Sequence, residues 1–146
     1  QITIRDLVRN ALRMRPDRIV VGEVRSGETL DMLQAMNTGH DGSLCTGHGN
    51  SPLGMLSRLE AMYLTAASFP VDAIRSQIVE AIDVIVHLGR MVDKSRKILE
   101  IAEVEGFHEG RYIVNPLFRY HRDKGLIPTN NRMKNTIKAE RKGITL

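Results

Sequence analysis

The sequence is poor in several residue types, and each scarcity restricts the kind of protein it encodes. Its 146 residues include one cysteine and no tryptophan, and only 4% are aromatic. A single cysteine cannot build an internal disulfide framework, so we expect a reducing compartment, the cytoplasm. No apolar run approaches the roughly 20 residues that cross a bilayer. The chain also does not open with the basic and apolar blocks of a secretory signal.

The remaining composition is that of an ordinary globular protein. Hydrophobic residues make up 42% and charged residues 26% of a chain long enough for one domain with a core. The formal net charge of +4 permits a polyanionic partner. It does not predict one, because modest basicity is common among soluble proteins.

The first half of the sequence alternates helical and strand-like segments. Apolar residues recur with helical spacing in four segments, which begin at Thr3, Ser26, Ser51 and Val71. Thr3 and Ser26 are placed to cap the first two of these helices. The runs "RIVVGEVR" and "SLCT" are instead typical of short strands buried on both faces, as in a parallel sheet.

From Asp83 onward the pattern changes to strands. The runs "VIVHLG", "KILEIAEV" and "RYIVNPLFRY", separated by polar turns, predict an antiparallel meander. Pro116 predicts that its strand lies at an edge or ends there. A weak basic helix is expected around residues 131–141. The fold class is therefore α/β, with parallel strands and helices followed by an antiparallel meander and a basic helical tail.

A carboxylate follows the first predicted strand. Glu23 would lie at the carboxyl end of that strand, where open α/β sheets bind ligands and where P-loop ATPases carry the Walker B acid. Gly22 stands where the usual first acid of such a pair would be. The residues alone also allow Glu23 to be simply the start of a polar loop.

A histidine follows the second predicted strand. Gly47 and Gly49 flank His48, so backbone can approach a ligand closely and the imidazole is left unshielded. A histidine there can donate a hydrogen bond to a phosphate oxygen, and the hydroxyl of Thr46 can add a second. The alternative is a turn that is rich in glycine for geometric reasons only.

The same segment contains possible zinc ligands, namely His40, Asp41, Cys45 and His48. Zinc sites usually show two pairs of closely spaced ligands. Only Cys45 and His48 have such a spacing, and no second pair follows, so we predict no metal site in this chain.

Arginines form a row along the first helix. Arg5, Arg9 and Arg13 recur every four residues, and Arg15 follows. Such a row is usually a solvated face, although Arg9, Arg13 or Arg15 could reach a neighbouring subunit's phosphate as an arginine finger does. Arg25, two residues after Glu23, is the better candidate for a polar contact with a ligand near the strand end.

Taken together, the residues from Ala11 to Pro52 closely resemble the secretion and pilus ATPases of type II and type IV systems. The resemblance is strongest to the CpaF-like branch that assembles Flp, or tight-adherence, pili, and it extends through "SRLEAM" to "LIPTNNRMKN". It implies that "VGEVR" is the Walker B segment, with Glu23 activating water for ATP hydrolysis. It further implies that "GHDGSLCTGHGN" is the His box, with His48 near the γ-phosphate.

The resemblance also covers the neighbours of these two residues. It places Gly22, Arg25, Thr46 and Asn50 near the nucleotide. Two positions of the His box depart from the family's T-T-x-H-A-N pattern, because Cys45 replaces the first threonine and Gly49 replaces alanine. Both replacements are small, so they affect the stiffness of the loop more than its chemistry.

One part of a P-loop ATPase is missing from the sequence. The Walker A loop, G-x-x-x-x-G-K-[ST], cradles the phosphates with backbone amides and a lysine, and no such run occurs here. We therefore expect the chain to be the C-terminal part of a longer ATPase. Residues 1–120 would form part of a RecA-like domain and residues 121–146 a basic tail packed on it. We expect this part alone to be inactive and to bind neither ATP nor magnesium tightly.

The resemblance implies a homohexamer at the cytoplasmic face of the inner membrane. ATP hydrolysis would power pilus assembly or protein secretion there, with membrane attachment through pilus or secretion platform proteins. Two other function classes remain open: a nucleic-acid-binding or RecA-like DNA motor module, and a standalone protein-interaction domain. We expect no nucleic-acid partner, because aromatic stacking platforms are scarce.

Overall fold

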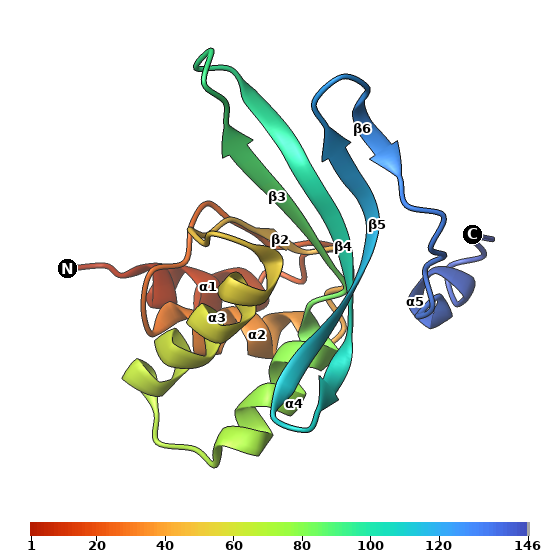
Figure 1. Cartoon of the computed structure of the whole chain (residues 1–146). Coiled ribbons are helices and arrows are strands. Elements are labelled where there is room, and N and C mark those ends of the chain that lie inside the picture. The colour runs from red at the N-terminus through yellow and green to blue at the C-terminus, as the bar shows by residue number, and fades with distance from the viewer. Residues whose placement is uncertain (146) are drawn as a thin grey trace. The chain divides into compact units, whose positions relative to one another are not determined.

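The computed structural model describes residues 1–145, and these residues form two compact units. The first unit contains residues 1–50 and 54–81, and the second contains residues 51–53 and the chain from residue 82 onward. Parallel strands with helices form the first unit, and an antiparallel sheet with a short helix forms the second (Figure 1). The predicted α/β fold class is confirmed.

The first unit is built around a buried helix. Its helices are α1 (Ile4–Leu12), α2 (Glu28–Met36), α3 (Pro52–Ala66), whose first residues belong to the second unit, and α4 (Val71–Ala81). Six of the nine residues of α2 are buried, and α2 contacts both α1 and α4. Leu33 of α2, Leu56 of α3 and Ile74 of α4 are completely buried, as core residues of a helical layer should be.

The first two helices begin in different ways. The Thr3 hydroxyl accepts the amide hydrogen of Asp6 at 3.2 Å, and the Asp6 carboxylate accepts that of Thr3 at 2.9 Å, so the predicted cap of α1 is confirmed. The prediction that Ser26 caps α2 is wrong. The carboxylate of Glu28 accepts the amide hydrogens of Arg25 at 2.5 Å and Ser26 at 3.0 Å. A carboxylate is the stronger acceptor, which explains why it closes this turn instead of the hydroxyl.

The strands of the first unit are short and parallel. Strand β1 (Val20–Val21) pairs with β2 (Leu44–Cys45), with Val20 opposite Leu44 and Val21 opposite Cys45. Val21 is buried, whereas Val20 and Leu44 are 71% and 63% exposed. The prediction that both strands are buried on both faces is therefore wrong for the described residues. An apolar run shows that one face is covered, but it cannot show whether a second layer covers the other.

The second unit contains the predicted meander. Its strands β3 (Val84–Arg90), β4 (Arg96–His108), β5 (Arg111–His121) and β6 (Gly125–Pro128) pair in that order, all antiparallel. The boundary that we placed after residue 120 falls one residue before the end of β5, and β6 follows it. The expectation that Pro116 lies at an edge or ends its strand is also wrong. A shift in the β4–β5 register beside Pro116 accommodates the missing amide hydrogen.

The tail is held by a buried acid of the sheet. Glu103 on β4 is fully buried and accepts hydrogen bonds from Asn115 Nδ2 at 3.0 Å, from the Lys134 amide at 3.0 Å and from the Asn135 amide at 2.6 Å. These bonds hold residues 134 and 135 outside a helix, so the helix expected over 131–141 is reduced to α5 (Ile137–Glu140). None of the helices within residues 1–145 has the length and apolar character needed to traverse a bilayer.

Candidate active site

The carboxyl ends of β1 and β2 lie side by side because the two strands are parallel. Gly22 and Glu23 follow β1, and Thr46 and His48 follow β2. Two hydrogen bonds join these segments beyond the last strand pair. The Val24 amide donates to the Thr46 carbonyl at 2.9 Å, and the Thr46 hydroxyl donates to the Gly22 carbonyl. The sheet therefore brings together two side chains that are 25 residues apart in sequence, Glu23 and His48.

Glu23 is bound by two basic side chains. Its Oε1 lies 2.6 Å from Nε2 of His48, and its Oε2 lies 2.5 Å from Nη2 of Arg25. The Glu23 side chain is 24% exposed, whereas those of His48 and Arg25 are 80% and 73% exposed. The carboxylate is thus anchored near the strand, while both of its partners reach it from the solvent side.

The electrostatics of the cluster keep Glu23 ionised. The hydrogen bond from Arg25, together with the charges of Arg25 and His48, holds the pKa of the Glu23 carboxyl below its ordinary value despite partial desolvation. The same hydrogen bond raises the pKa of Arg25. The contact with Nε2 of His48 is close, but its geometry does not satisfy the hydrogen-bonding capacity of Oε1 of Glu23.

The glycines of the histidine loop are packed closely against α3. A Cβ atom added at Gly47 would lie 2.3 Å from Cε of Met55, and one added at Gly49 would lie 3.1 Å from Cβ of Met55. Neither contact leaves room for a side chain without movement. The glycines therefore let the loop lie flat on the start of α3 while the His48 ring projects to Glu23, which accounts for the departure at Gly49 from the family's alanine.

Sequence reasoning missed the residue that positions Arg25. The Glu28 carboxylate accepts hydrogen bonds from the amides of Arg25 and Ser26 and so fixes the turn that contains Arg25. From this turn the Arg25 side chain points to Glu23. The signal was available, since an acid three residues after Arg25 can close such a turn. Of the other residues predicted near the nucleotide, Gly22 has open space around it and Asn50 is exposed two residues after His48.

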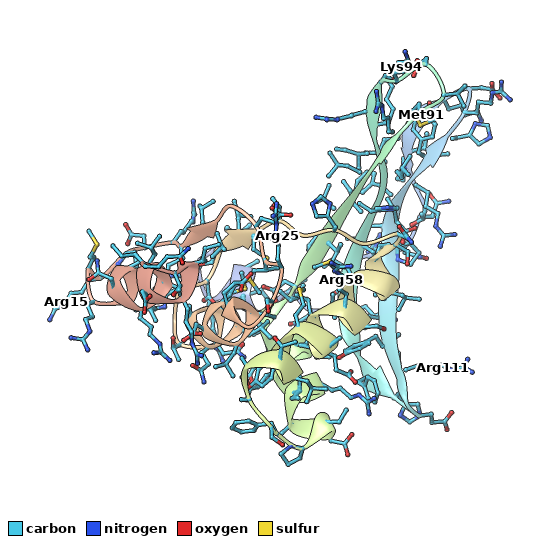
Figure 2. The ribbon with its side chains drawn as sticks, turned by 90° about the vertical axis from the view of Figure 1, so that its left-hand side faces the viewer. Arg15, Arg25, Arg58, Met91, Lys94 and Arg111 are labelled. Atoms are coloured by element: carbon cyan, nitrogen blue, oxygen red, sulfur yellow. The ribbon has the colours of Figure 1, made fainter. Side chains whose placement is uncertain are left out.

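The arginines proposed for a subunit interface have different surroundings. Arg9 lies 2.9 Å from the carboxylate of Asp31 on α2, and Arg5 lies 2.6 Å from the same group, which is almost fully buried. Arg9 therefore helps to neutralise a buried acid of its own chain. Arg13 and Arg15 are exposed, and Figure 2 shows Arg15 and Arg25 on separate parts of the first unit.

The zinc alternative finds no support in this segment. Within residues 1–145, no three His, Cys, Asp or Glu side chains gather closely enough to hold a metal ion. Burial raises the pKa of the Cys45 thiol, which disfavours the thiolate form that metals bind.

The family model described as type II/IV secretion system protein matches residues 1–142. The chain belongs to this family. Conjugal transfer protein TrbB of Rhizobium radiobacter is 41% identical over 106 residues, which are 73% of this chain and 32% of that protein. The type IV secretion system protein PtlH of Bordetella pertussis is 33% identical over 105 residues, 68% of this chain and 31% of its own length.

A solved structure shows the same fold. The VirB11 ATPase from the Brucella suis type IV secretion system, in complex with sulphate, superposes with a TM-score of 0.66 and 33% identity over 70% of this chain and 32% of that one. The chain thus spans about a third of the length of the secretion proteins that it matches. The family resemblance inferred from the sequence is confirmed at the level of type II/IV secretion proteins.

Proposed function

We propose that these residues form the hydrolytic half of an ATPase site in a motor that powers macromolecular export or pilus assembly. The observation that carries this proposal is the pair formed by Glu23 and His48, which meet at 2.6 Å at the adjoining carboxyl ends of two parallel strands. This edge is where open α/β sheets bind ligands. Membership of the type II/IV secretion family and the likeness to the VirB11 ATPase support the same function.

Each residue of the cluster has a chemical role in this proposal. Glu23, kept ionised by Arg25, orients and polarises the water that attacks phosphorus. His48 lies against the Glu23 carboxylate and can turn to donate a hydrogen bond to a phosphate oxygen. The Thr46 hydroxyl holds the two segments in register. ATP, when bound, would supply the phosphoryl group, and magnesium would neutralise part of the negative charge on its phosphates.

The contacts of Glu23 leave it able to bind water. One oxygen lies against His48 and the other against Arg25. A carboxylate offers about four lone-pair positions, so Glu23 can still accept a hydrogen bond from a water beside these two contacts. The His48 and Arg25 side chains are mostly exposed and are free to turn toward a phosphate.

The residues present fit the part of a nucleotide site that activates the attacking water, but they do not include the part that binds the phosphates. The chain has no Walker A run, and a hydrogen bond from His48 cannot replace an amide cradle and a lysine. We therefore infer that the 146 residues alone bind ATP and magnesium weakly and do not turn over. The activity belongs to a longer protein, since its relatives are about three times as long.

The finer assignments rest on the sequence resemblance. They are the CpaF-like Flp-pilus branch, a homohexamer, and attachment to platform proteins at the inner face of the cell membrane. In such a ring, Arg13 and Arg15 are exposed in the segment that follows α1 and are available to a neighbouring subunit, whereas Arg9 on α1 is engaged by Asp31.

The test is steady-state phosphate release by the longer protein that contains these residues and a Walker A loop. Glu23→Gln should retain ATP binding and lose turnover by about 100-fold or more, because an amide keeps the shape but cannot accept a proton. Asp17→Asn is the control for loss of an exposed acid in the same unit outside the Glu23 cluster, and it should leave most of the turnover. If Glu23→Gln turned over at the wild-type rate, Glu23 would have no part in the reaction.

A further inference from the structure

One end of the antiparallel sheet in the second unit is strongly basic. The β3–β4 turn and the β5–β6 turn lie at this same end, as the antiparallel pairing requires (Figure 1). Residues 90–97 contain four lysines and arginines against one acid, and residues 119–124 contain three against one. The two turns therefore have net charges of +3 and +2, and Arg119 of the second turn also lies 3.7 Å from Glu100 on β4, an acid outside both ranges.

The opposite end of the sheet has a different charge. Residues 105–111 around the β4–β5 turn contain two acids and one arginine, a net charge of −1. Figure 2 shows Lys94 and Met91 at the basic end and Arg111 at the far end of the same sheet. The basic character is therefore a property of one end and not of the sheet as a whole.

An apolar side chain projects from the centre of the basic end. Val92, in the β3–β4 turn, is fully exposed, and Leu88 on β3 is 60% exposed. The exposed basic residues that flank the turn are Arg90, Lys94, Arg96 and Lys97. The exposed apolar surface of Val92 and Leu88 lies beside these basic residues and is available for burial against a partner.

Hydrogen bonds hold this turn in one shape. The Met91 amide donates to the Ser95 carbonyl at 2.8 Å, and the Lys94 amide donates to the Met91 carbonyl at 3.0 Å. The Asp93 carboxylate accepts the amide of Ser95 at 2.9 Å and its hydroxyl at 2.6 Å. The single acid of the turn is thus directed back into the backbone, while Val92 and the basic residues project outward.

We propose that this basic end, defined as residues 88–97 and 119–126, binds directly to the surface of a bilayer rich in anionic phospholipid. Lysine and arginine side chains contact the lipid phosphates, and Val92 enters the headgroup region. The surface lies entirely within the second unit, so the proposal does not depend on the ATPase site. It adds a direct lipid contact to the attachment through platform proteins inferred above.

The exposed valine favours a membrane over a nucleic acid. Nucleic acids bind basic side chains and stack on aromatic ones, but the only Phe, Tyr or Trp of the basic end is Tyr120, which is half-buried. A phosphate backbone also has no apolar region in which Val92 could be buried. A lipid interface satisfies both features, because it attracts the cations and accepts the apolar side chain.

The test is co-sedimentation of the full chain with phosphatidylcholine vesicles, with and without phosphatidylglycerol. A triple change of Lys94, Arg96 and Lys97 to Gln removes three charges from the basic end. The matched control changes Arg132, Arg141 and Lys142 to Gln, which removes three charges from exposed positions elsewhere in the second unit. Circular dichroism verifies that all variants are folded.

We expect binding only to vesicles that contain phosphatidylglycerol. The Lys94, Arg96 and Lys97 triple variant should lose about 100-fold in affinity, since each basic residue near an anionic surface contributes roughly fivefold. Val92→Ser, which leaves the charge unchanged, should lose up to about tenfold. The control variant should bind nearly as well as the wild type.

Four outcomes would overturn the proposal. Equal losses in the triple variant and its control would mean that overall charge alone drives binding. Equal binding to neutral vesicles, or no vesicle binding at all, would exclude an anionic lipid site. Binding of duplex DNA or of polyglutamate that depends on the same three residues, without vesicle binding, would assign the basic end to another partner.

Discussion

Replacing Glu103 by Gln should loosen the attachment of the C-terminal segment to the sheet. Glu103 is fully buried and serves three donors, the side chain of Asn115 and the backbone amides of Lys134 and Asn135. A glutamine has one acceptor oxygen and directs an NH2 group at the remaining donors. The substitution therefore leaves at least one buried donor facing another donor.

The magnitude follows from these contacts. An unsatisfied buried donor costs about 2 kcal/mol, and the other two bonds lose the strength that the charge gave them, so the total is about 3 kcal/mol. Glu105→Gln is the control on the same strand. Its carboxylate pairs with Lys134 Nζ at 2.9 Å but remains partly exposed, so we expect a loss of at most about 1 kcal/mol.

Two measurements test this prediction. Urea unfolding followed by circular dichroism gives the loss of stability, and amide hydrogen exchange at Lys134 and Asn135 reports the local opening directly. Exchange at these two amides should accelerate in Glu103→Gln and change little in Glu105→Gln. If both variants lost the same stability and the two amides exchanged no faster, the buried carboxylate would not be what holds the tail.

The pH dependence of the effect has a definite sign. Burial acts to raise the pKa of Glu103, but the hydrogen bonds from Asn115, Asn135 and Lys134 together outweigh it and hold the pKa below its ordinary 4.5. A lowered folded-state pKa means that the stabilisation is complete above the unfolded pKa and is lost as pH falls through the folded value. The stability difference between the wild type and Glu103→Gln should therefore narrow as the pH falls below about 4.5.

Two further predictions concern the histidine loop. In the longer protein, His48→Ala should reduce phosphate release with little change in Tm, because the His48 side chain is 80% exposed; a large fall in Tm would show a structural role instead. Gly49→Ala should destabilise the first unit by about 1–2 kcal/mol in urea unfolding, because the new Cβ lies 3.1 Å from Cβ and 3.2 Å from the backbone Cα of Met55, which are fixed by α3. Gly47→Ala should cost less, because its new Cβ meets only the flexible end of the Met55 side chain, and Gly22→Ala, where nothing lies within 4 Å, is the control.

The sequence was sufficient to place Glu23 and His48 together for a simple topological reason. Each follows a short apolar run, and the carboxyl ends of parallel strands meet at one edge of a sheet. The pattern did not reveal that Arg25 and His48 occupy both oxygens of Glu23. Side-chain pairing of this kind depends on rotamers and on the turn fixed by Glu28, which no hydrophobic periodicity encodes.

Burial was the feature least accessible from the sequence. In "KILEIAEVEGF" Glu103 and Glu105 are two residues apart, as on one solvated strand face, yet Glu103 is fully buried while Glu105 is partly exposed. The difference arises because residues 134 and 135, about 30 positions later, cover Glu103. The same long-range contact shortened the predicted basic helix, since amides bonded to Glu103 are not available for helical bonds.

The arrangement around Glu23 also indicates how the proposed ATPase site can change its contacts. The carboxylate is fixed by the strand end and is only 24% exposed, whereas the side chains of its two basic partners are mostly exposed. A change of contacts is therefore easier through movement of Arg25 or His48 than through movement of Glu23 itself. The His48 loop is tied to β1 through the Thr46 hydroxyl and rests on Met55 of α3. A displacement of His48 toward a phosphate would therefore also displace the start of α3. Through this contact the loop can couple nucleotide binding to movement within the first unit.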